Sequence, residues 1–184
     1  MAKVIKISSL LSIILTVLFY ILFYNFNNNI FYTLAITFGT TAYHFTMRLI
    51  VGYSVDFILN NKVNYNRRWF KVSKFEMKIY NKLMVKKWKY KMPTYNPELF
   101  DISKHSWDEV LMTMCQSEIV HEIIFVLSFM PILAIIWFGE PLAFVITSIL
   151  SALFDLMFVI MQRYNRNRIL RLKVRLLSLI ACFF

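Results

Sequence analysis

Residues 119–161 read IVHEIIFVLSFMPILAIIWFGEPLAFVITSILSALFDLMFVIM, two apolar runs of about 20 residues joined by Gly139-Glu140-Pro141. A helix of about 20 apolar residues is long enough to cross the hydrocarbon core of a bilayer. Glycine and proline on either side of a single polar residue mark a tight turn. The stretch therefore predicts two membrane-spanning helices, 119–138 and 142–161, with a short outer turn between them and a kink at Pro131.

Two further apolar stretches lie near the N-terminus, at residues 7–24 and 30–59. A secretory signal peptide would also begin with lysines and an apolar run, but no small-residue cleavage site follows here, so we expect a retained helix. The second stretch is longer than a bilayer requires, so we expect it to tilt or to project beyond the membrane. The sequence thus predicts an all-α integral membrane protein, a single domain over residues 1–184, with four transmembrane helices arranged as two hairpins.

The distribution of the 21 lysines and arginines sets the expected topology. All but Arg48 lie in three blocks, at residues 3–6, 62–104 and 163–175. Basic residues collect on the cytoplasmic side of multi-pass membrane proteins. We therefore expect a cell-membrane protein in which both termini, the central segment 62–115 and the basic tail 163–184 are cytoplasmic.

The composition agrees with this topology. A mean hydropathy of +0.56 and 59% hydrophobic residues are too apolar for a soluble domain of this size. A net charge of +11 would suggest nucleic-acid binding in a soluble protein, but here the topology explains it, and no nucleic-acid partner is expected. Cys115 and Cys182 match no metal-ligand spacing and are expected to be free thiols.

The central segment has the pattern of a basic amphipathic helix from Lys74 to Tyr90. Aromatic and aliphatic residues recur at spacings of four, and lysines occupy the other faces: Phe75, Ile79 and Leu83; Tyr80, Met84 and Trp88; Lys74, Lys78, Lys82, Lys86 and Lys89. Such a helix suits the lipid headgroup layer. The alternative is a loop whose charge only orients the protein. The tail 166–184 repeats the pattern and is a candidate for a second interfacial helix.

Charged residues inside apolar spans are candidate functional residues, because burying a charge in a membrane is costly unless it is paired. His44 and Arg48 lie one turn apart on the same helix face, with Asp56 two turns further on. We expect Asp56 or Glu118 to pair with Arg48. The pair is either a structural link between helices or part of a site for an anion or a polar headgroup.

The third span begins with Glu118, His121 and Glu122, which share one helix face. A carboxylate one turn from an imidazole can fix its tautomer and raise its basicity, as a general base requires. The alternative is a group of solvated boundary residues. A metal site of the di-metal bundle type would need the Glu-x-x-His motif twice, and one copy is present, so no metal is expected.

Five polar residues end the fourth span: Gln162, Arg163, Asn165, Arg166 and Arg168. Arginines at this end of a helix interact favourably with its dipole and follow the positive-inside rule. They are also good ligands for phosphate or carboxylate groups. Gln162, Asn165 and Arg166 share a face and, with Asp155, are candidates to line a polar cavity that leads into the bilayer.

Three segments together resemble one family. Glu118-Ile119-Val120-His121, the string Gln162-Arg163-Tyr164-Asn165-Arg166-Asn167-Arg168, and Lys87-Trp88-Lys89-Tyr90-Lys91-Met92-Pro93 are similar to segments of the small integral-membrane glycosyl-4,4'-diaponeurosporenoate acyltransferases of carotenoid biosynthesis. The resemblance extends over residues 75–171. Asn167 stands where the carotenoid enzymes are expected to have proline.

The resemblance implies transfer of a fatty acyl group from a thioester donor to a hydroxyl, expected to be that of a sugar, on a lipid-linked acceptor. For this chemistry we expect His121 to be the base, oriented by Glu118, with His44 in reserve. The expected substrate-binding residues are Arg48, Trp88, Gln162, Arg163, Asn165, Arg166 and Arg168. Acyl-CoA is the expected co-substrate, a membrane lipid or glycolipid the expected acceptor, and no tightly bound cofactor is expected.

The alternative function is a non-enzymatic membrane protein that binds lipid or acts as an assembly subunit. The number of polar residues in or beside the spans counts against it, because leucine at those positions would make a better anchor. The sequence leaves the oligomeric state open.

Overall fold

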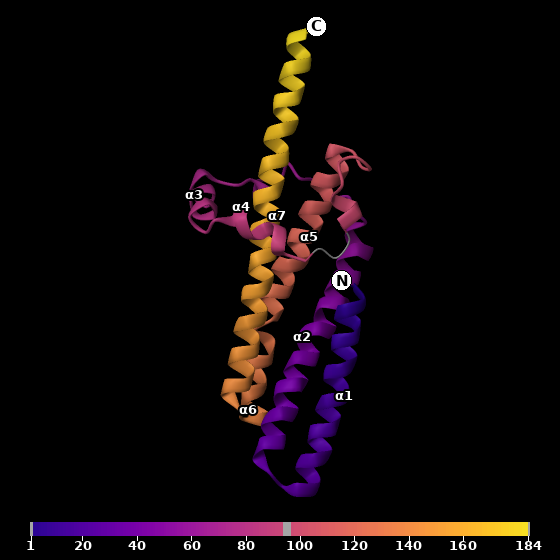
Figure 1. Ribbon diagram of the computed structural model, residues 1–184, viewed down its shortest axis with the longest axis vertical. Coiled ribbons are helices and arrows are strands. Elements are labelled where there is room, and N and C mark those ends of the chain that lie inside the picture. The colour runs from indigo at the N-terminus through magenta and orange to yellow at the C-terminus, as the bar shows by residue number, and fades with distance from the viewer. Residues whose placement is uncertain (1, 94–96, 184) are drawn as a thin grey trace. The chain divides into compact units, whose positions relative to one another are not determined.

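A computed structural model describes residues 2–93 and 97–183, and their regular secondary structure is entirely helical. The longer helices are α1 (Ala2–Phe26), α2 (Asn29–Leu59), α5 (Trp107–Leu127) and α7 (Pro141–Phe183) (Figure 1). Three helices are short: α3 (Lys74–Lys82), α4 (Val85–Trp88) and α6 (Ile135–Phe138). Short 3₁₀ turns cover Arg68–Phe70, Lys89–Lys91, Pro97–Phe100 and Met130–Ala134. The expected all-α class is confirmed.

Three segments are long and apolar enough to cross a membrane: Lys3–Phe26, Trp107–Phe138 and Pro141–Leu176. Many of their large apolar side chains are exposed, among them Leu10, Trp137 and Leu142. Exposed apolar surface of this kind is typical of helices surrounded by lipid. The chain thus has the properties of a membrane protein. The other expected span, 30–59, is helical as α2, but its threonines and charged residues make it more polar than the other three.

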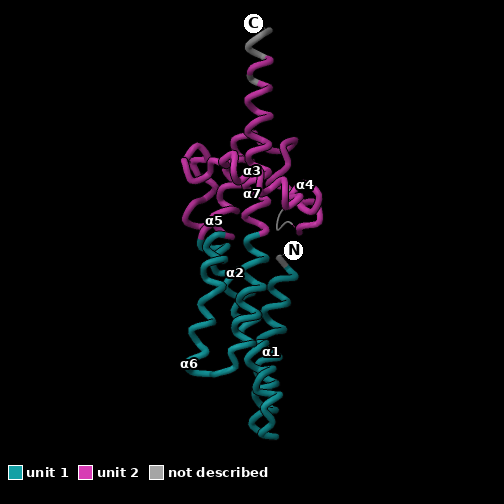
Figure 2. Tube along the Cα trace, turned by 90° about the vertical axis from the view of Figure 1, so that its left-hand side faces the viewer, with its two compact units in different colours: residues 1–54, 122–156 teal, residues 55–121, 157–184 magenta. Residues whose placement is uncertain are grey.

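The chain forms two compact units, residues 1–54 with 122–156, and residues 55–121 with 157–184 (Figure 2). In the first unit, α1 and α2 pack along each other. Phe19 stacks on Phe38 with ring centroids 5.4 Å apart, and the hydroxyls of Ser9 and Thr46 hydrogen-bond at 2.8 Å. Gly39 faces Thr16 across this contact, and a Cβ added there would lie 3.5 Å from the Thr16 methyl group, an ordinary van der Waals distance.

The expected kink at Pro131 is a complete interruption of the helix. Helix α5 ends at Leu127, and Pro131 lies at the start of the 3₁₀ turn Met130–Ala134. Proline has no N–H to continue the hydrogen-bond ladder, so the chain leaves the α-helical path before it. The turn at Gly139 and Glu140 is confirmed, because both residues adopt positive φ, 67° and 51°, directly before α7 begins at Pro141.

The predicted amphipathic helix from Lys74 to Tyr90 is wrong as a single element. The chain breaks at Met84, whose φ of 51° lies in the left-handed region, and this separates α3 from α4. The predicted apolar stripe is also divided: Tyr80 is buried, whereas Phe75 and Ile79 are exposed. The apolar residues therefore have a regular helical spacing in sequence, but the packing of Tyr80 in the folded chain decides which of them are buried.

Two expected boundaries also differ from the structure. Helix α5 begins at Trp107, well before residue 119, because Ser106 and Glu109 cap its N-terminus through reciprocal hydrogen bonds of 3.3 and 2.8 Å. The tail is not a separate interfacial helix, because α7 continues unbroken to Phe183. The side chains of Leu177 and Cys182, on which expectations for the tail depended, lie outside the described part of the structure. Cys115 is a buried free thiol, as expected.

Candidate functional site

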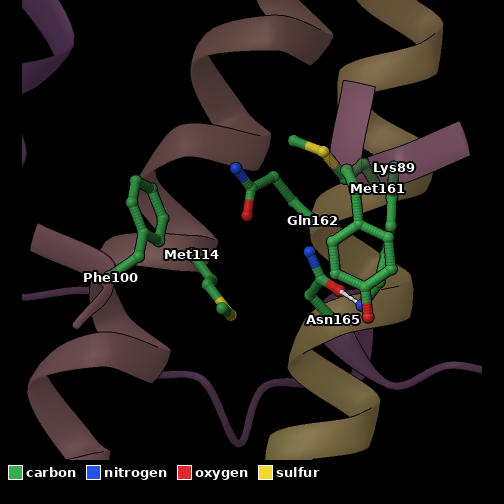
Figure 3. Close-up of a pocket in the computed structure, with 7 residues that line it drawn as sticks. Lys89, Phe100, Met114, Met161, Gln162 and Asn165 are labelled. Carbon is green, nitrogen blue, oxygen red and sulfur yellow. Dashed lines mark hydrogen bonds between the residues drawn. The ribbon is translucent and has the colours of Figure 1, made fainter. Parts of the chain in front are cut away.

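A cavity of about 200 Å³ in the second unit combines a polar and an apolar wall (Figure 3). The residues that line it come from the 3₁₀ turns after α4 and before α5, and from α5 and α7: Lys89, Tyr90, Phe100, Met114, Met161, Gln162 and Asn165. Figure 3 shows Phe100 and Met114 across the cavity from Gln162 and Asn165. A pocket of this kind can hold a ligand that has both hydroxyl groups and a hydrocarbon part.

Lys89 forms the charged part of the polar wall. Its side chain is 9% exposed, and Nζ donates a hydrogen bond of 2.6 Å to Oδ1 of Asn165. The ammonium also lies 4.9 Å from the ring centroid of Tyr90 and 5.2 Å from that of Tyr164. Burial lowers the pKa of Lys89 below its ordinary value of 10.5. The positive charge of Lys89, together with Arg168, lowers the pKa of the exposed Tyr90 phenol.

Gln162 is nearly buried, and its Nε2 donates to Oγ of Ser117 at 3.2 Å. This bond fixes the Gln162 amide of α7 against α5. Gln162 and Asn165 were expected to line a polar cavity, and the structure places both in the wall of this one. Asp155, which was expected to line the same cavity, belongs to the other unit, where it pairs with Arg48.

Glu118 lies at the centre of a buried ion cluster. It is 0% exposed, and it accepts hydrogen bonds from Nη1 of Arg163, at 2.8 Å, and from Nη1 of Arg166. Arg166 is also 0% exposed, donates to the carbonyl of Phe70 at 2.6 Å and lies over the Phe70 ring at 5.0 Å. The guanidinium of Arg166 is therefore held by partners inside the protein.

Arg163 extends the cluster to α3. Its Nη2 lies 2.9 Å from the carboxylate of Glu76, which closes a capping box with Ser73 at the start of that helix. Burial raises the pKa of Glu76, but hydrogen bonds from Ser73 and the charge of Arg163 outweigh this effect, and the pKa lies below its ordinary value. The cluster thus ties α3, α5 and α7 together in one unit.

His121 lies three residues after Glu118 on α5. Its half-buried imidazole stacks on the ring of Phe158, with centroids 4.4 Å apart and planes at 5°. Phe158 lies one turn before Gln162 on α7, and Met114 lies two turns before His121 on the same face of α5. The imidazole is thus held in a defined orientation, within two helical turns of residues that line the cavity.

His44 and Arg48 lie in the first unit, and the expected partners of Arg48 are wrong. Arg48 pairs with Asp155 and donates to Oγ of Ser151 at 2.9 Å. Asp56 instead accepts a 2.9 Å hydrogen bond from Nε2 of Gln116 in the second unit. The partner of Arg48 lies 107 residues away in sequence, so the helical spacing of α2 contained no signal for it.

Trp88 lies beside the cavity in sequence but does not line it. Its Nε1 donates to the carbonyl of Leu83 at 3.0 Å and closes the turn between α3 and α4. Five lining residues were not predicted: Lys89, Tyr90, Phe100, Met114 and Met161. Lys89 and Tyr90 had a usable signal, because they are part of the family-like string around Trp88. The other three had none, since isolated methionines and phenylalanines are ordinary core residues. Arg168 is exposed, and the described residues contain no group of three or more His, Cys, Asp or Glu placed to hold a metal ion.

The model of the glycosyl-4,4'-diaponeurosporenoate acyltransferase family matches residues 66–175, more than half of the chain. The chain belongs to this family. The match includes every residue of the cavity, the Glu118 cluster and His121, and it confirms the resemblance drawn from residues 75–171. It begins after α2, so His44 and Arg48 lie outside it. Comparison with curated proteins and with solved structures gives no match.

Proposed function

We propose that the protein transfers a fatty acyl group from a thioester donor, acyl-CoA, to a sugar hydroxyl of a lipid-linked acceptor. Membership in an acyltransferase family supports acyl transfer. The cavity is the observation that carries the choice of acceptor, because its wall pairs Lys89, Gln162 and Asn165 with Phe100 and Met114. Amide and ammonium groups can bind sugar hydroxyls, while the aromatic and thioether side chains accommodate hydrocarbon.

His121 is the proposed general base. It takes the proton from the acceptor hydroxyl as the oxygen attacks the thioester carbonyl. A C–O bond forms, the C–S bond breaks, and the thiol of CoA leaves with a proton. Along α5, His121 lies about 10 Å from Met114, at a rise of 1.5 Å per residue. A sugar bound against the polar wall spans part of that distance.

The Glu118 cluster is proposed to position this machinery. Glu118 and Arg166 are fully buried and engage each other, so we assign them the role of holding α5 against α7 beneath His121. Arg163 shares this role through Glu118 and Glu76. The exposed Arg168 and the lysines of α3 and α4 are the proposed contacts for the phosphates of acyl-CoA.

The membrane layout that goes with this function has four spans. We propose that α2 crosses the bilayer together with the three more apolar segments, which gives two hairpins and places both termini and the central segment in the cytoplasm. Its single arginine is already neutralised by Asp155, which lowers the cost of insertion. Acyl-CoA would then reach the protein from the side on which it is made.

The test incubates the purified full chain with acyl-CoA labelled in its acyl group and a lipid extract from the host, and measures transfer of the label to lipid. Wild type, His121→Ala and His105→Ala are compared. His105 is the matched control because it is a partly exposed histidine that does not line the cavity. We expect wild type and His105→Ala to label a glycolipid, and His121→Ala to lose at least about 100-fold in turnover. Near-normal turnover in His121→Ala would reject the base. If all three proteins left the acyl-CoA unconsumed and transferred no label from any of several donors, a non-enzymatic lipid-binding or assembly role would be favoured.

A further inference from the structure

Several polar atoms of the first unit are buried without a hydrogen-bond partner. His44 is 4% exposed, and within the described part of the chain neither of its ring nitrogens has a hydrogen-bond partner. The same holds for Nε of Arg48 and for Oγ of Ser148, which is fully buried. Buried polar groups are almost always hydrogen-bonded to protein, ligand or water, so several such atoms in one unit require partners that the described side chains do not supply.

These unpaired buried atoms lie at the same level of α2 and α7, two helices that run in the same direction. Tyr32, near the start of α2, donates to the carbonyl of Phe138, just before α7. Further along, Arg48 of α2 contacts Ser151 and Asp155 of α7. This register places His44, one turn before Arg48, level with Ser148. Ser148 lies one turn before Ser151 and two turns before Asp155 on the same face of α7.

The polar groups next to these unpaired atoms already have hydrogen-bond partners. Nη1 of Arg48 donates to the carbonyl of His44 at 3.0 Å, and Nη2 bonds Ser151 and Asp155. The Ser151 hydroxyl in turn lies 3.0 Å from that of Ser128. The two opposite charges neutralise each other, so an anionic headgroup would have to displace Asp155 from Arg48, and a cation would have to displace Arg48 from Asp155.

We propose that His44, Ser148 and Nε of Arg48 bind the hydroxyl group of a neutral lipid. A neutral imidazole has one donor and one acceptor nitrogen, and the serine hydroxyl can act in either sense. A lipid hydroxyl, which both donates and accepts, satisfies them without disturbing the ion pair. The exposed apolar side chains of α1, α2 and α7, such as Leu11, Ile50 and Leu150, put hydrocarbon around the unit. This binding is separate from acyl transfer and does not depend on it.

Native mass spectrometry of the detergent-solubilised full chain tests the proposal by titration with four lipids. The hydroxyl-bearing probes are dioleoylglycerol and a monohexosyl diacylglycerol, which separate a glycerol hydroxyl from a sugar hydroxyl as its source. The controls are the 3-O-methyl ether of dioleoylglycerol, which cannot donate, and dioleoyl phosphatidic acid, which is anionic. We expect at least one hydroxyl-bearing probe to bind about tenfold more tightly than the methyl ether.

His44→Phe removes the ring nitrogens while keeping an aromatic ring, and Ser148→Ala removes only a hydroxyl. Each should weaken binding of the preferred probe by about tenfold, whereas His105→Phe should leave it unchanged. Both variants should fold, because each removes an unsatisfied buried group. Equal affinity for dioleoylglycerol and its ether, tighter binding of phosphatidic acid that depends on His44, or unchanged affinity in both variants would overturn the proposal. Failure of every lipid to bind would also overturn it and would leave buried water as the occupant.

Discussion

Replacement of Glu118 by glutamine should destabilise the protein more than any other single charge removal in the second unit. The carboxylate is fully buried and accepts from Arg163 and Arg166. Removing one member of a buried ion pair costs about 3–5 kcal/mol, because the remaining charge stays desolvated. Arg163 keeps Glu76 at 2.9 Å, but the partners described for Arg166 besides Glu118 are neutral, among them the carbonyl and ring of Phe70. The loss therefore comes mainly from Arg166.

Glu76→Gln is the matched control. Its side chain is 29% exposed and pairs with the same Arg163, so its loss should cost about 1 kcal/mol or less. Glutamine also preserves the capping box with Ser73, which isolates the effect of charge. Thermal unfolding in detergent, followed by circular dichroism, should show a midpoint lower by roughly 10 °C for Glu118→Gln and by roughly 2 °C for Glu76→Gln.

A double variant separates the unpaired charge from other effects. Adding Arg166→Met to Glu118→Gln removes the charge that the first substitution leaves unpaired, and apolar replacement of buried ion pairs is often neutral or stabilising. We expect the double variant to be more stable than Glu118→Gln alone. A Glu118→Gln midpoint within about 2 °C of wild type, or a double variant that is less stable still, would refute the assignment of a buried ion cluster.

Three further predictions concern the region around the cavity. Met84→Gly should stabilise the protein by up to about 1 kcal/mol, because Met84 has a φ of 51°, in the left-handed region that glycine adopts more easily than other residues. Met84→Ala keeps a Cβ, so an equal gain in stability from this variant would show that backbone strain is not the cause. The pKa of Lys89 is lowered in the folded protein, so the unfolded chain binds this proton more tightly, and the free energy of unfolding of wild type should rise as pH rises towards 10.5. Chemical denaturation at several pH values should show this rise for wild type but not for Lys89→Met. Parallel plots of unfolding free energy against pH for the two proteins would contradict the prediction. Met114→Trp should partly fill the cavity of about 200 Å³. In the transfer assay it should raise the KM for the acceptor at least about tenfold, with little change in the KM for acyl-CoA. An unchanged KM for the acceptor would show that the acceptor does not bind in this cavity.

Local physics explains which parts of the fold were predictable. The lengths of the apolar runs and the turn at Gly139 and Glu140 depend on neighbouring residues, and the structure has helices and a turn there. The early start of α5 was also readable, since Ser106 and Glu109 have capping-box spacing. The break at Met84 was not, because a helical pattern of apolar residues continues through it and only packing of Tyr80 distinguishes the two sides.

The sequence by itself determined that the chain is helical and suited to a membrane, because hydropathy and run length act over short distances. It also singled out polar groups placed where leucine would make a better anchor: His44, Arg48, Asp56, Glu118, His121, Asp155 and Gln162. The tertiary structure alone decided their partners: Glu118 with two arginines, Asn165 with Lys89, and Arg48 with Asp155 rather than Asp56. Pairing depends on which helix faces meet, and residues 45 to 107 positions apart carry no spacing rule that would reveal it.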